Sequence, residues 1–357
     1  MVLQRFEKEN SMSHLDILIV GAGPTGLASA IEAKRAGLSC LVVEKGCLVN
    51  SLFHYPVNMV FFTTPELLEI GDIPMVCVRD KPTRNEALKY YRLVAQHFGL
   101  TIHAYEEVRE IKGSDGHFAV ATHRSDGAAG RYTAKKLVLA TGYYDKPNLL
   151  GIPGEDSAKV SHYYREAHPF YDRDVAVVGG RNSAAEAALD LYRHGARVTL
   201  IHRSAGLSDR IKYWVRPDIE NRIQNQEITA LFDTRVVEIR PDSILVASVH
   251  ATPEQGKMQS IKNDFVFALT GYHPDAGFLQ RAGVEVEPRR MRPFCDPETR
   301  ESNVPGIYLA GVIIAGIDTN EIFIENGRFH GKQIIRDIAA KLGCQEVAQA
   351  ASSSSSS

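Results

Sequence analysis

The stretch DILIVGAGPTGLASAIEAKRAGLSCLVVE, residues 16–44, decides the fold of the first part of the chain. The β-branched run at 17–20 predicts a buried parallel strand, which leads directly into the motif G-x-G-x-x-G at 21–26. An alanine-rich helix follows, and a second apolar strand then ends in Glu44. Strand, glycine turn, helix, strand and terminal acid in this order predict a Rossmann-like unit that binds a dinucleotide.

The glycines of this turn have separate physical roles. Gly21 permits the tight turn, Gly23 lets the backbone approach a pyrophosphate, and Gly26 permits close packing of the helix on the strand. The N-terminus of the helix offers N–H groups and a partial positive charge to the same phosphates. Glu44 follows at the distance where a carboxylate accepts from both ribose hydroxyls. This unit is therefore expected to hold a nucleotide with a free ribose, such as FAD or NAD.

A second unit of the same kind follows later in the chain. A strand at 175–178 leads into the turn GGRNSA at 179–184, and a helix connects this turn to the next strand, 198–201. That strand ends in His202 and Arg203 rather than in an acid. A glutamate would repel a 2′-phosphate, whereas Arg203 can pair with one, so the second unit is expected to prefer NADPH.

Arg181 departs from this pattern, because it stands where the middle glycine of G-x-G-x-x-A is expected. Its side chain could crowd the pyrophosphate, could point outward and contact it, or could be a plain surface arginine. The sequence leaves these three interpretations open, and Arg181 is counted among the expected NADPH contacts.

The composition is that of an ordinary soluble globular protein, with 24% charged and 44% hydrophobic residues among 357, a length that favours two domains. The formal charge of −2 argues against nucleic acid or an acidic membrane surface as the main partner. No stretch approaches the roughly 20 apolar residues that span a bilayer. Five scattered cysteines without a C-x-x-C argue against a zinc site or an internal redox pair, and a cytoplasmic location is expected.

Two dinucleotide units in this order resemble the two-domain flavoprotein disulfide reductases, such as low-molecular-weight thioredoxin reductase. The sequence L-A-T-G at 139–142 closes the first unit as in that family, and an A-G pair at 310–311 ends a late strand. Four further segments resemble the bacillithiol disulfide reductase subgroup: residues 55–70, 81–84, 214–223 and 320–327. The resemblance covers the chain from about residue 14 to about residue 342.

The resemblance implies an α/β fold of two Rossmann-like domains, in which the NADPH domain is inserted into a split FAD domain. We expect the FAD domain over 14–152 and 266–345 and the NADPH domain over 153–265. Residues 1–13 and 346–357 are expected to be disordered. The resemblance also implies NADPH-dependent reduction of a low-molecular-weight disulfide such as bacillithiol disulfide, by a homodimer or a larger oligomer.

Three departures from the resembled families bear on the chemistry. The C-x-x-C of thioredoxin reductases has no counterpart, since the corresponding residues read RNSA at 181–184. Bacillithiol disulfide reductases usually carry a cysteine in the first glycine motif, where this chain has Thr25. Val312 replaces an aspartate that bonds the ribityl chain of the flavin in thioredoxin reductases, which shifts anchoring onto backbone groups. Electrons are therefore expected to pass to an external acceptor with no protein dithiol in between.

The motifs and the resemblance together give the expected contacts of the two cofactors. Those of FAD are Gly21, Gly23, Pro24, Thr25, Gly26, Glu44, Lys45, Asn50, Ser51, Thr141, Gly142, Gly311, Val312 and Ile322. Those of NADPH are Gly179, Gly180, Arg181, Asn182, Ser183, Ala184, His202, Arg203 and Arg210. His54 and Tyr55 are candidate proton donors to a leaving thiolate, and no metal site is expected.

Other functions stay open on the sequence alone. A basic rim is compatible with an acidic redox-protein acceptor, as in a ferredoxin or flavodoxin reductase; it consists of Arg203, Arg210, Lys212, Arg216 and Arg222. A flavin-dependent monooxygenase also combines FAD and NADPH units, and a redox sensor would bind both nucleotides without turnover. Oxygenated product would identify the monooxygenase, and steady NADPH oxidation would exclude the sensor.

Overall fold

The computed structural model describes residues 14–250 and 258–343, so the termini expected to be disordered, 1–13 and 346–357, lie outside the described residues. The chain divides into two compact units. Among the described residues, unit 1 consists of 14–53, 63–146 and 273–343, and unit 2 of 54–62, 147–250 and 258–272.

The division of the chain differs slightly from the expected domain boundaries. It falls after Lys146 and Tyr272, whereas the sequence prediction placed it after residues 152 and 265. Strand β14 (Phe265–Ala268) explains the later second boundary, because it pairs with two strands of unit 2.

Residues 54–62 also lie with unit 2, although the sequence prediction placed them in the FAD domain. The N–H of Val57 donates to the carbonyl of Arg165 at 2.9 Å. The ring of Phe62 stacks on Trp214 with ring centres 5.3 Å apart. These contacts join residues far apart in sequence, so no local pattern could have predicted them.

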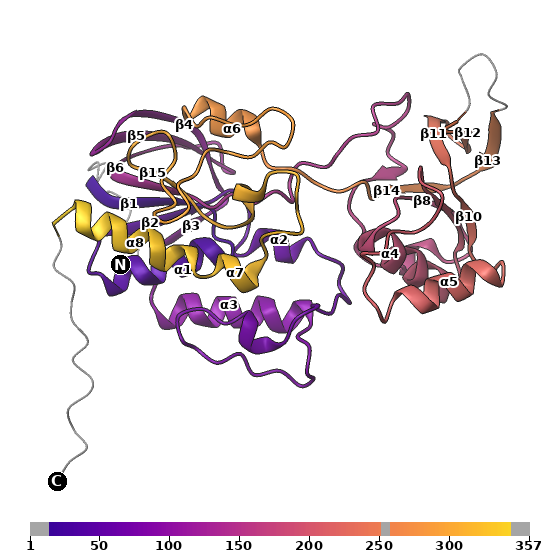
Figure 1. Ribbon diagram of the computed structural model, residues 1–357, viewed down its shortest axis with the longest axis horizontal. Helices are drawn as coiled ribbons and strands as arrows, with labels where there is room; N and C mark the ends of the chain where they lie inside the picture. The colour runs from indigo at the N-terminus through magenta and orange to yellow at the C-terminus, as the bar shows by residue number, and fades with distance from the viewer. Residues whose placement is uncertain (1–13, 251–257, 344–357) are drawn as a thin grey trace, which may run out of the picture. The chain divides into compact units, whose positions relative to one another are not determined.

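A seven-stranded sheet forms the centre of unit 1 (Figure 1). Its strands, in spatial order, are β3 (Ile102–Ala104), β2 (Cys40–Glu44), β1 (His14–Val20), β6 (Ala129–Leu139), β5 (His117–Arg124) and β4 (Glu106–Ser114), with β15 (Ile307–Leu309) also paired to β6. The first part of β6 pairs antiparallel with β5, and its end pairs in parallel with β15. The late strand β15 thereby joins the same sheet as β1.

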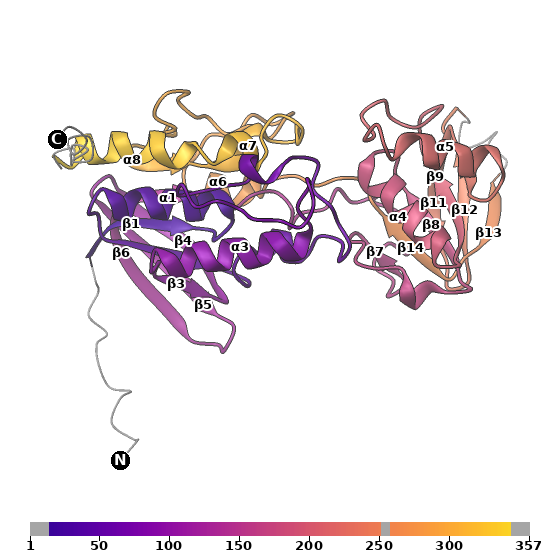
Figure 2. The ribbon, with the colours of Figure 1, turned by 90° about the horizontal axis from the view of Figure 1, so that it is seen from below.

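Helices cover the sheet of unit 1. They are α1 (Pro24–Arg35), α2 (Asn50–Phe53), α3 (Arg84–His97), α6 (Ala276–Arg281), α7 (Ile324–Gly327), α8 (His330–Lys341) and the 3₁₀ helices η1 (Pro65–Leu67) and η3 (Gly311–Ala315). Helices α1 and α8 lie side by side in both views (Figures 1 and 2). Strand β1 is wholly buried at Ile17, Leu18 and Ile19, as expected of a parallel strand with both faces covered.

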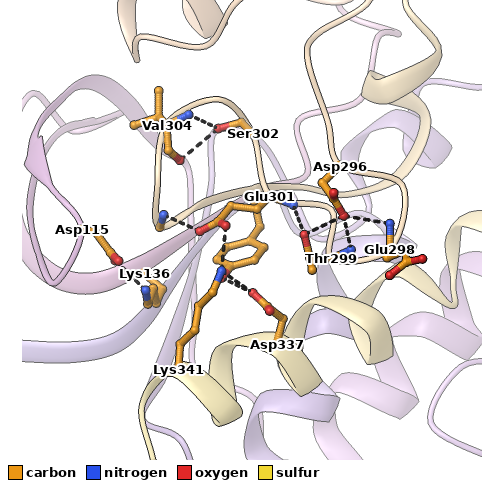
Figure 3. A network of polar contacts seen from close by, with 12 residues as sticks. Asp115, Lys136, Asp296, Glu298, Thr299, Glu301, Ser302, Val304, Asp337 and Lys341 are labelled. Atoms are coloured by element: carbon orange, nitrogen blue, oxygen red, sulfur yellow. Dashed lines mark hydrogen bonds and ion pairs between the residues drawn. The ribbon is translucent and has the colours of Figure 1, made fainter.

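A polar network ties α8 to strand β15 (Figure 3). The hydroxyl of Tyr308 donates to Asp337 at 2.6 Å. The ammonium of Lys341 lies 2.7 Å from carboxylate oxygens of both Asp337 and Glu301. Glu301 also accepts the N–H of Gly306 at 2.8 Å. Helix α8 is therefore held in a fixed position against the strand that leads to η3.

Unit 2 is built around a five-stranded parallel sheet. Its order is β10 (Thr229–Leu231), β9 (Arg197–Ile201), β8 (Asp174–Val178), β14 and β7 (Val160–Ser161). Helices α4 (Asn182–Arg193) and α5 (Arg216–Gln224), the 3₁₀ helix η2 (His168–Phe170) and a small antiparallel sheet of β11 (Thr234–Ile239), β12 (Ser243–Ser248) and β13 (Gln259–Lys262) complete the unit.

Two apolar cores lie on the two faces of the unit 2 sheet. Ala184 and Ala188 of α4 pack against Val177 on one face, and Ile244 of β12 packs with Ala176 on the other. The expected α/β class with two Rossmann-like units is confirmed. Among residues 14–250 and 258–343, no helix has the length and apolar character needed to cross a membrane.

Candidate functional site

The parallel strands of unit 1 end together at one edge of the sheet. Val20 of β1 lies opposite Val43 of β2 and Leu139 of β6, and Leu139 lies opposite Leu309 of β15. The residues that follow these four strands therefore meet. Ligands of open parallel sheets bind outside the carboxyl ends of the strands, so this edge is the candidate site of unit 1.

The first glycine turn has the steric features of a pyrophosphate cradle. Gly21 has φ +107°, and a Cβ there would lie 2.5 Å from the carbonyl oxygen of Ala140. A Cβ on Gly26 would overlap the carbonyl of Gly21. A Cβ on Gly23, in contrast, would meet nothing within 4 Å, so the backbone is open to a ligand there. Pro24 then starts helix α1 as its first residue.

Glu44 is buried and fixed at the end of β2. Its Oε2 accepts the N–H of Ala22 at 2.8 Å, and its Oε1 accepts the N–H of Gly46 at 2.9 Å. Burial raises the pKa of Glu44, and these two N–H groups oppose that rise. A carboxylate has about four acceptor positions, so Glu44 can still accept from hydroxyl groups of a ribose.

The neighbouring loop residues hold one another. Lys45 forms an ion pair with Asp145 at 2.8 Å. The side-chain oxygen of Asn50 accepts the N–H of Cys47 at 3.3 Å, which braces the loop after β2. Ser51 is half-buried beside Asn50 in α2. Lys45 and Asn50, two of the predicted FAD contacts, thus each bind another residue of the protein.

Residues from distant segments converge on Thr25. A Cβ on Gly311, which has φ +82°, would lie 2.9 Å from the Thr25 hydroxyl, and one on Gly327 would lie 3.3 Å from it. The position of a Cβ on Gly327 is also 3.5 Å from the Ile322 side chain. The hydroxyl of Thr25 therefore packs between two glycines at the end of β15 and in α7.

Gly142, a further predicted strand-end glycine, also lies at this edge. The side chain of Val312 lies 3.9 Å from where a Cβ on Gly142 would be, so the turns after β15 and β6 touch. Thr141, which lies in the sequence between the end of β6 and Gly142, is half-buried.

His330, in α8, is a site residue that the sequence reasoning missed. Its Nδ1 accepts the N–H of Gly311 at 3.0 Å. It lies one turn before Ile334 and two turns before Ile338, both fully buried. The sequence feature that could have indicated it is a polar residue on the apolar face of an amphipathic helix.

The strand ends of unit 2 form a second cradle. Val178 of β8 lies opposite Ile201 of β9 and Ala268 of β14. Gly179 has φ +151°, and a Cβ there would lie 2.6 Å from the carbonyl of Leu269.

The imidazole of His202 lies directly on the second glycine of this turn, so that a Cβ on Gly180 would overlap it. Burial lowers the pKa of His202, and the positive charges of Arg203 and Arg181 lower it further. Arg203 directly follows His202 in the chain and Arg181 directly follows Gly180, so both arginines are adjacent to this contact. Their side chains are exposed, and neither has a hydrogen bond or ion pair within the part of the chain that the structure describes.

The loop after Arg203 is fastened to the glycine turn. The side-chain NH₂ of Asn182 donates to the carbonyl of Arg210 at 3.1 Å, and its oxygen accepts the N–H of Lys212 at 2.8 Å. The N–H of Ser208 donates to the carbonyl of Gly180 at 3.0 Å. Asn182 thus shapes the site by holding this loop. Ser183 is exposed at the start of α4, and Ala184 is buried in the core.

Most of the basic rim is neutralised within unit 2. Arg216 pairs with Asp209 at 2.8 Å and Glu220 at 2.7 Å. Two further rim cations are also paired: Lys212 with Glu186 at 2.6 Å, and Arg222 with Asp218 and Glu227 at 3.2 and 2.9 Å. The rim therefore offers little net charge to an acidic protein partner.

His54 and Tyr55, the candidate proton donors, are half-buried in the segment 54–62 of unit 2. Four cysteines fall within the described residues, and all are free thiols: Cys40, Cys47, Cys77 and Cys295. Burial raises the pKa of each thiol, to about 11 for Cys40 and Cys295. No three His, Cys, Asp or Glu side chains in 14–250 and 258–343 are grouped to hold a metal ion.

Comparisons with known proteins agree with this geometry. The family described as pyridine nucleotide-disulphide oxidoreductase matches residues 18–311. Bacilliredoxin reductase Bdr of Bacillus subtilis (strain 168) is 45% identical over 325 residues, 91% of this chain and 97% of the relative. The solved structures of bacillithiol disulfide reductase Bdr (YpdA) from Bacillus cereus and Staphylococcus aureus are 44% and 40% identical, with TM-scores of 0.88 and 0.86. Each alignment covers 92% of this chain and 99% of the solved one.

Proposed function

This chain belongs to the pyridine nucleotide-disulphide oxidoreductases, and we propose that it uses NADPH and FAD to reduce bacillithiol disulfide. As a member of that family it is an enzyme of the disulfide reductase kind, and the expected resemblance to bacillithiol disulfide reductases is confirmed. The observation that carries the choice of acceptor is the 44% identity to the bacillithiol disulfide reductase of Bacillus cereus over 99% of that chain. We further propose a cytoplasmic homo-oligomer.

We assign FAD to the edge of unit 1. The open backbone at Gly23 and the spare acceptor positions of buried Glu44 fit a pyrophosphate and a ribose with free hydroxyls. The negative charge of Glu44 would repel a 2′-phosphate. FAD, when bound, accepts two electrons from NADPH and can pass them to a disulfide. The contacts proposed for FAD are the fourteen residues named from the sequence, with the backbone near Gly311 and Ile322 nearest the flavin.

We assign NADPH to the edge of unit 2. His202 packs on Gly180. Arg203 follows His202 and Arg181 follows Gly180, and the charges of both arginines lower the pKa of His202. Both guanidinium groups have no partner within the described residues, so they can receive the 2′-phosphate together. For Arg181 we thus propose a contact with the 2′-phosphate, in addition to the three interpretations that the sequence left open. The other proposed contacts are those expected from the glycine turn and Arg210.

We propose that the acceptor disulfide takes its electrons without an intermediate protein disulfide. A relay needs two cysteines, and the described thiols are free groups whose raised pKa values disfavour the reactive thiolate. Thr25 holds the place of the family's cysteine. The net reaction consumes one NADPH, one proton and one disulfide and yields NADP⁺ and two thiols. His54 and Tyr55 stay candidates for delivering the proton to the leaving thiolate.

The test is steady-state NADPH oxidation with a panel of acceptors. We expect turnover with bacillithiol disulfide, and far slower turnover with glutathione disulfide, ferredoxin and flavodoxin. A bacilliredoxin in its mixed-disulfide form belongs in the panel, because the relatives are named for both acceptors. Oxidation of NADPH with ferredoxin but with no disulfide would contradict the proposal.

A further inference from the structure

We propose that His330 is a positioning residue for FAD, because its imidazole fixes the backbone of Gly311 at the turn that closes the site of unit 1. The inference rests on the proposed function, since it concerns how that cofactor is held.

The contact is a buried hydrogen bond with a defined tautomer. The N–H of Gly311 donates to Nδ1 of His330 at 3.0 Å, and His330 is 6% exposed. An imidazole that accepts at Nδ1 carries its proton on Nε2 and is neutral. Burial lowers the pKa of His330 to about 4, so this acceptor is present throughout the neutral range.

The orientation of the Gly311 peptide matters because the side chains of Gly311 and Val312 have no polar group to contact a ligand. Val312, the next residue, has no polar group, so any polar contact to the cofactor from Gly311–Val312 must come from the backbone. Gly311 has φ +82° and lies against Thr25 of the glycine turn. Leaving its buried N–H unpaired would favour a different peptide orientation.

The frame that holds His330 includes the glycine turn itself. A Cβ on Gly331 would lie 2.7 Å from the backbone N of Ser29, so α8 rests directly on the backbone of α1. The Ser29 hydroxyl donates to the carbonyl of Thr25 at 2.9 Å. The start of α8 therefore contacts the turn after β15 through His330 and, through Gly331, the helix that follows the turn after β1.

The test compares His330→Asn with His330→Gln. Asparagine places its amide oxygen near the position of Nδ1, whereas glutamine places its amide near Nε2, out of reach of Gly311. Titration of the apoprotein with FAD should give a near wild-type dissociation constant for H330N and one about tenfold or more higher for H330Q. The increase in melting temperature on adding FAD should shrink in H330Q alone.

Gln333→Leu is the matched control. Gln333 lies on the same helix and accepts from Arg300 at 2.9 Å, so its loss disturbs α8 without removing the bond to Gly311. Q333L should bind FAD as the wild type does. If H330Q binds FAD as tightly as wild type and only lowers the melting temperature of apo and loaded protein equally, His330 is merely structural and the inference is wrong. Failure of the wild-type chain to bind FAD would instead overturn the proposed function.

Discussion

Glu44, at the end of β2, accepts the N–H of Ala22 in the glycine turn after β1, with 2.8 Å between the two atoms. This bond places a buried carboxylate beside the backbone that is open at Gly23. The acid is thus part of the turn as well as the proposed partner of a ribose.

Replacing Glu44 by glutamine should weaken FAD binding, because one acceptor oxygen and the charge are lost while the shape is kept. Hydrogen bonds to charged groups contribute about 1.5–3 kcal/mol, so the FAD dissociation constant should rise roughly tenfold to 150-fold. Flavin content and apoprotein titration measure this. Glu32→Gln, which removes a surface ion pair with Arg35 on α1, is the control and should leave the flavin content unchanged. Full flavin content in E44Q would refute the assignment.

Removing either Arg203 or Arg181 should reduce the preference for NADPH over NADH. Each guanidinium is expected to contribute about 1.5–3 kcal/mol to 2′-phosphate binding, or roughly tenfold to 150-fold in the ratio of kcat/KM values. The values for NADH should change little. Arg222→Ala is the control, because Arg222 is already paired with Asp218 and Glu227.

The behaviour of Arg181→Ala separates two contacts. Equal losses with NADPH and NADH would place Arg181 on the pyrophosphate, which both nucleotides share. In that case the proposal that Arg181 and Arg203 bind the 2′-phosphate together would be wrong.

Replacing all five cysteines by serine or alanine should leave disulfide reduction in place. The reason is that a direct transfer uses no protein thiol, and the described thiols are protonated at neutral pH because burial raises their pKa. Folding and flavin content are checked first. A variant that is reduced normally by NADPH but no longer reduces the disulfide would reveal a cysteine relay.

Stability should depend on pH through His330. Burial holds its pKa at about 4 in the folded chain, against 6.5 for an ordinary histidine. Between these values only the unfolded state takes up the proton. The free energy of unfolding should therefore fall as the pH drops from 6.5 towards 4, by up to about 1.4 kcal/mol per pH unit.

Urea unfolding of wild type and H330N across this range isolates the contribution of His330, because other titrating groups are common to both. The difference in unfolding free energy should change with pH below 6.5 and be constant above it. A difference that is constant throughout would contradict the pKa shift.

The features that could be predicted are those written in short stretches of sequence. The turns at 21–26 and 179–184 and the terminal residues Glu44 and Arg203 follow from steric and charge rules that act locally. The register of parallel strands then brings these ends together.

The features that could not be predicted depend on contacts between distant residues. The stacking of Phe62 on Trp214 draws residues 54–62 into unit 2, and no local pattern encodes it. The ion pairs of Arg216 are a different case, because Glu220 lies four residues on in the same helix and Asp209 seven residues before. Their spacing could have been noticed in the sequence.

Anaerobic titration with NADPH, followed by addition of bacillithiol disulfide, tests the central claim most directly. Direct transfer predicts that one NADPH per bound FAD completes the reduction, and that one equivalent of disulfide restores the oxidised flavin spectrum and yields two thiols. Uptake of a second NADPH per chain, or a reduced flavin that bacillithiol disulfide leaves unchanged, would contradict it.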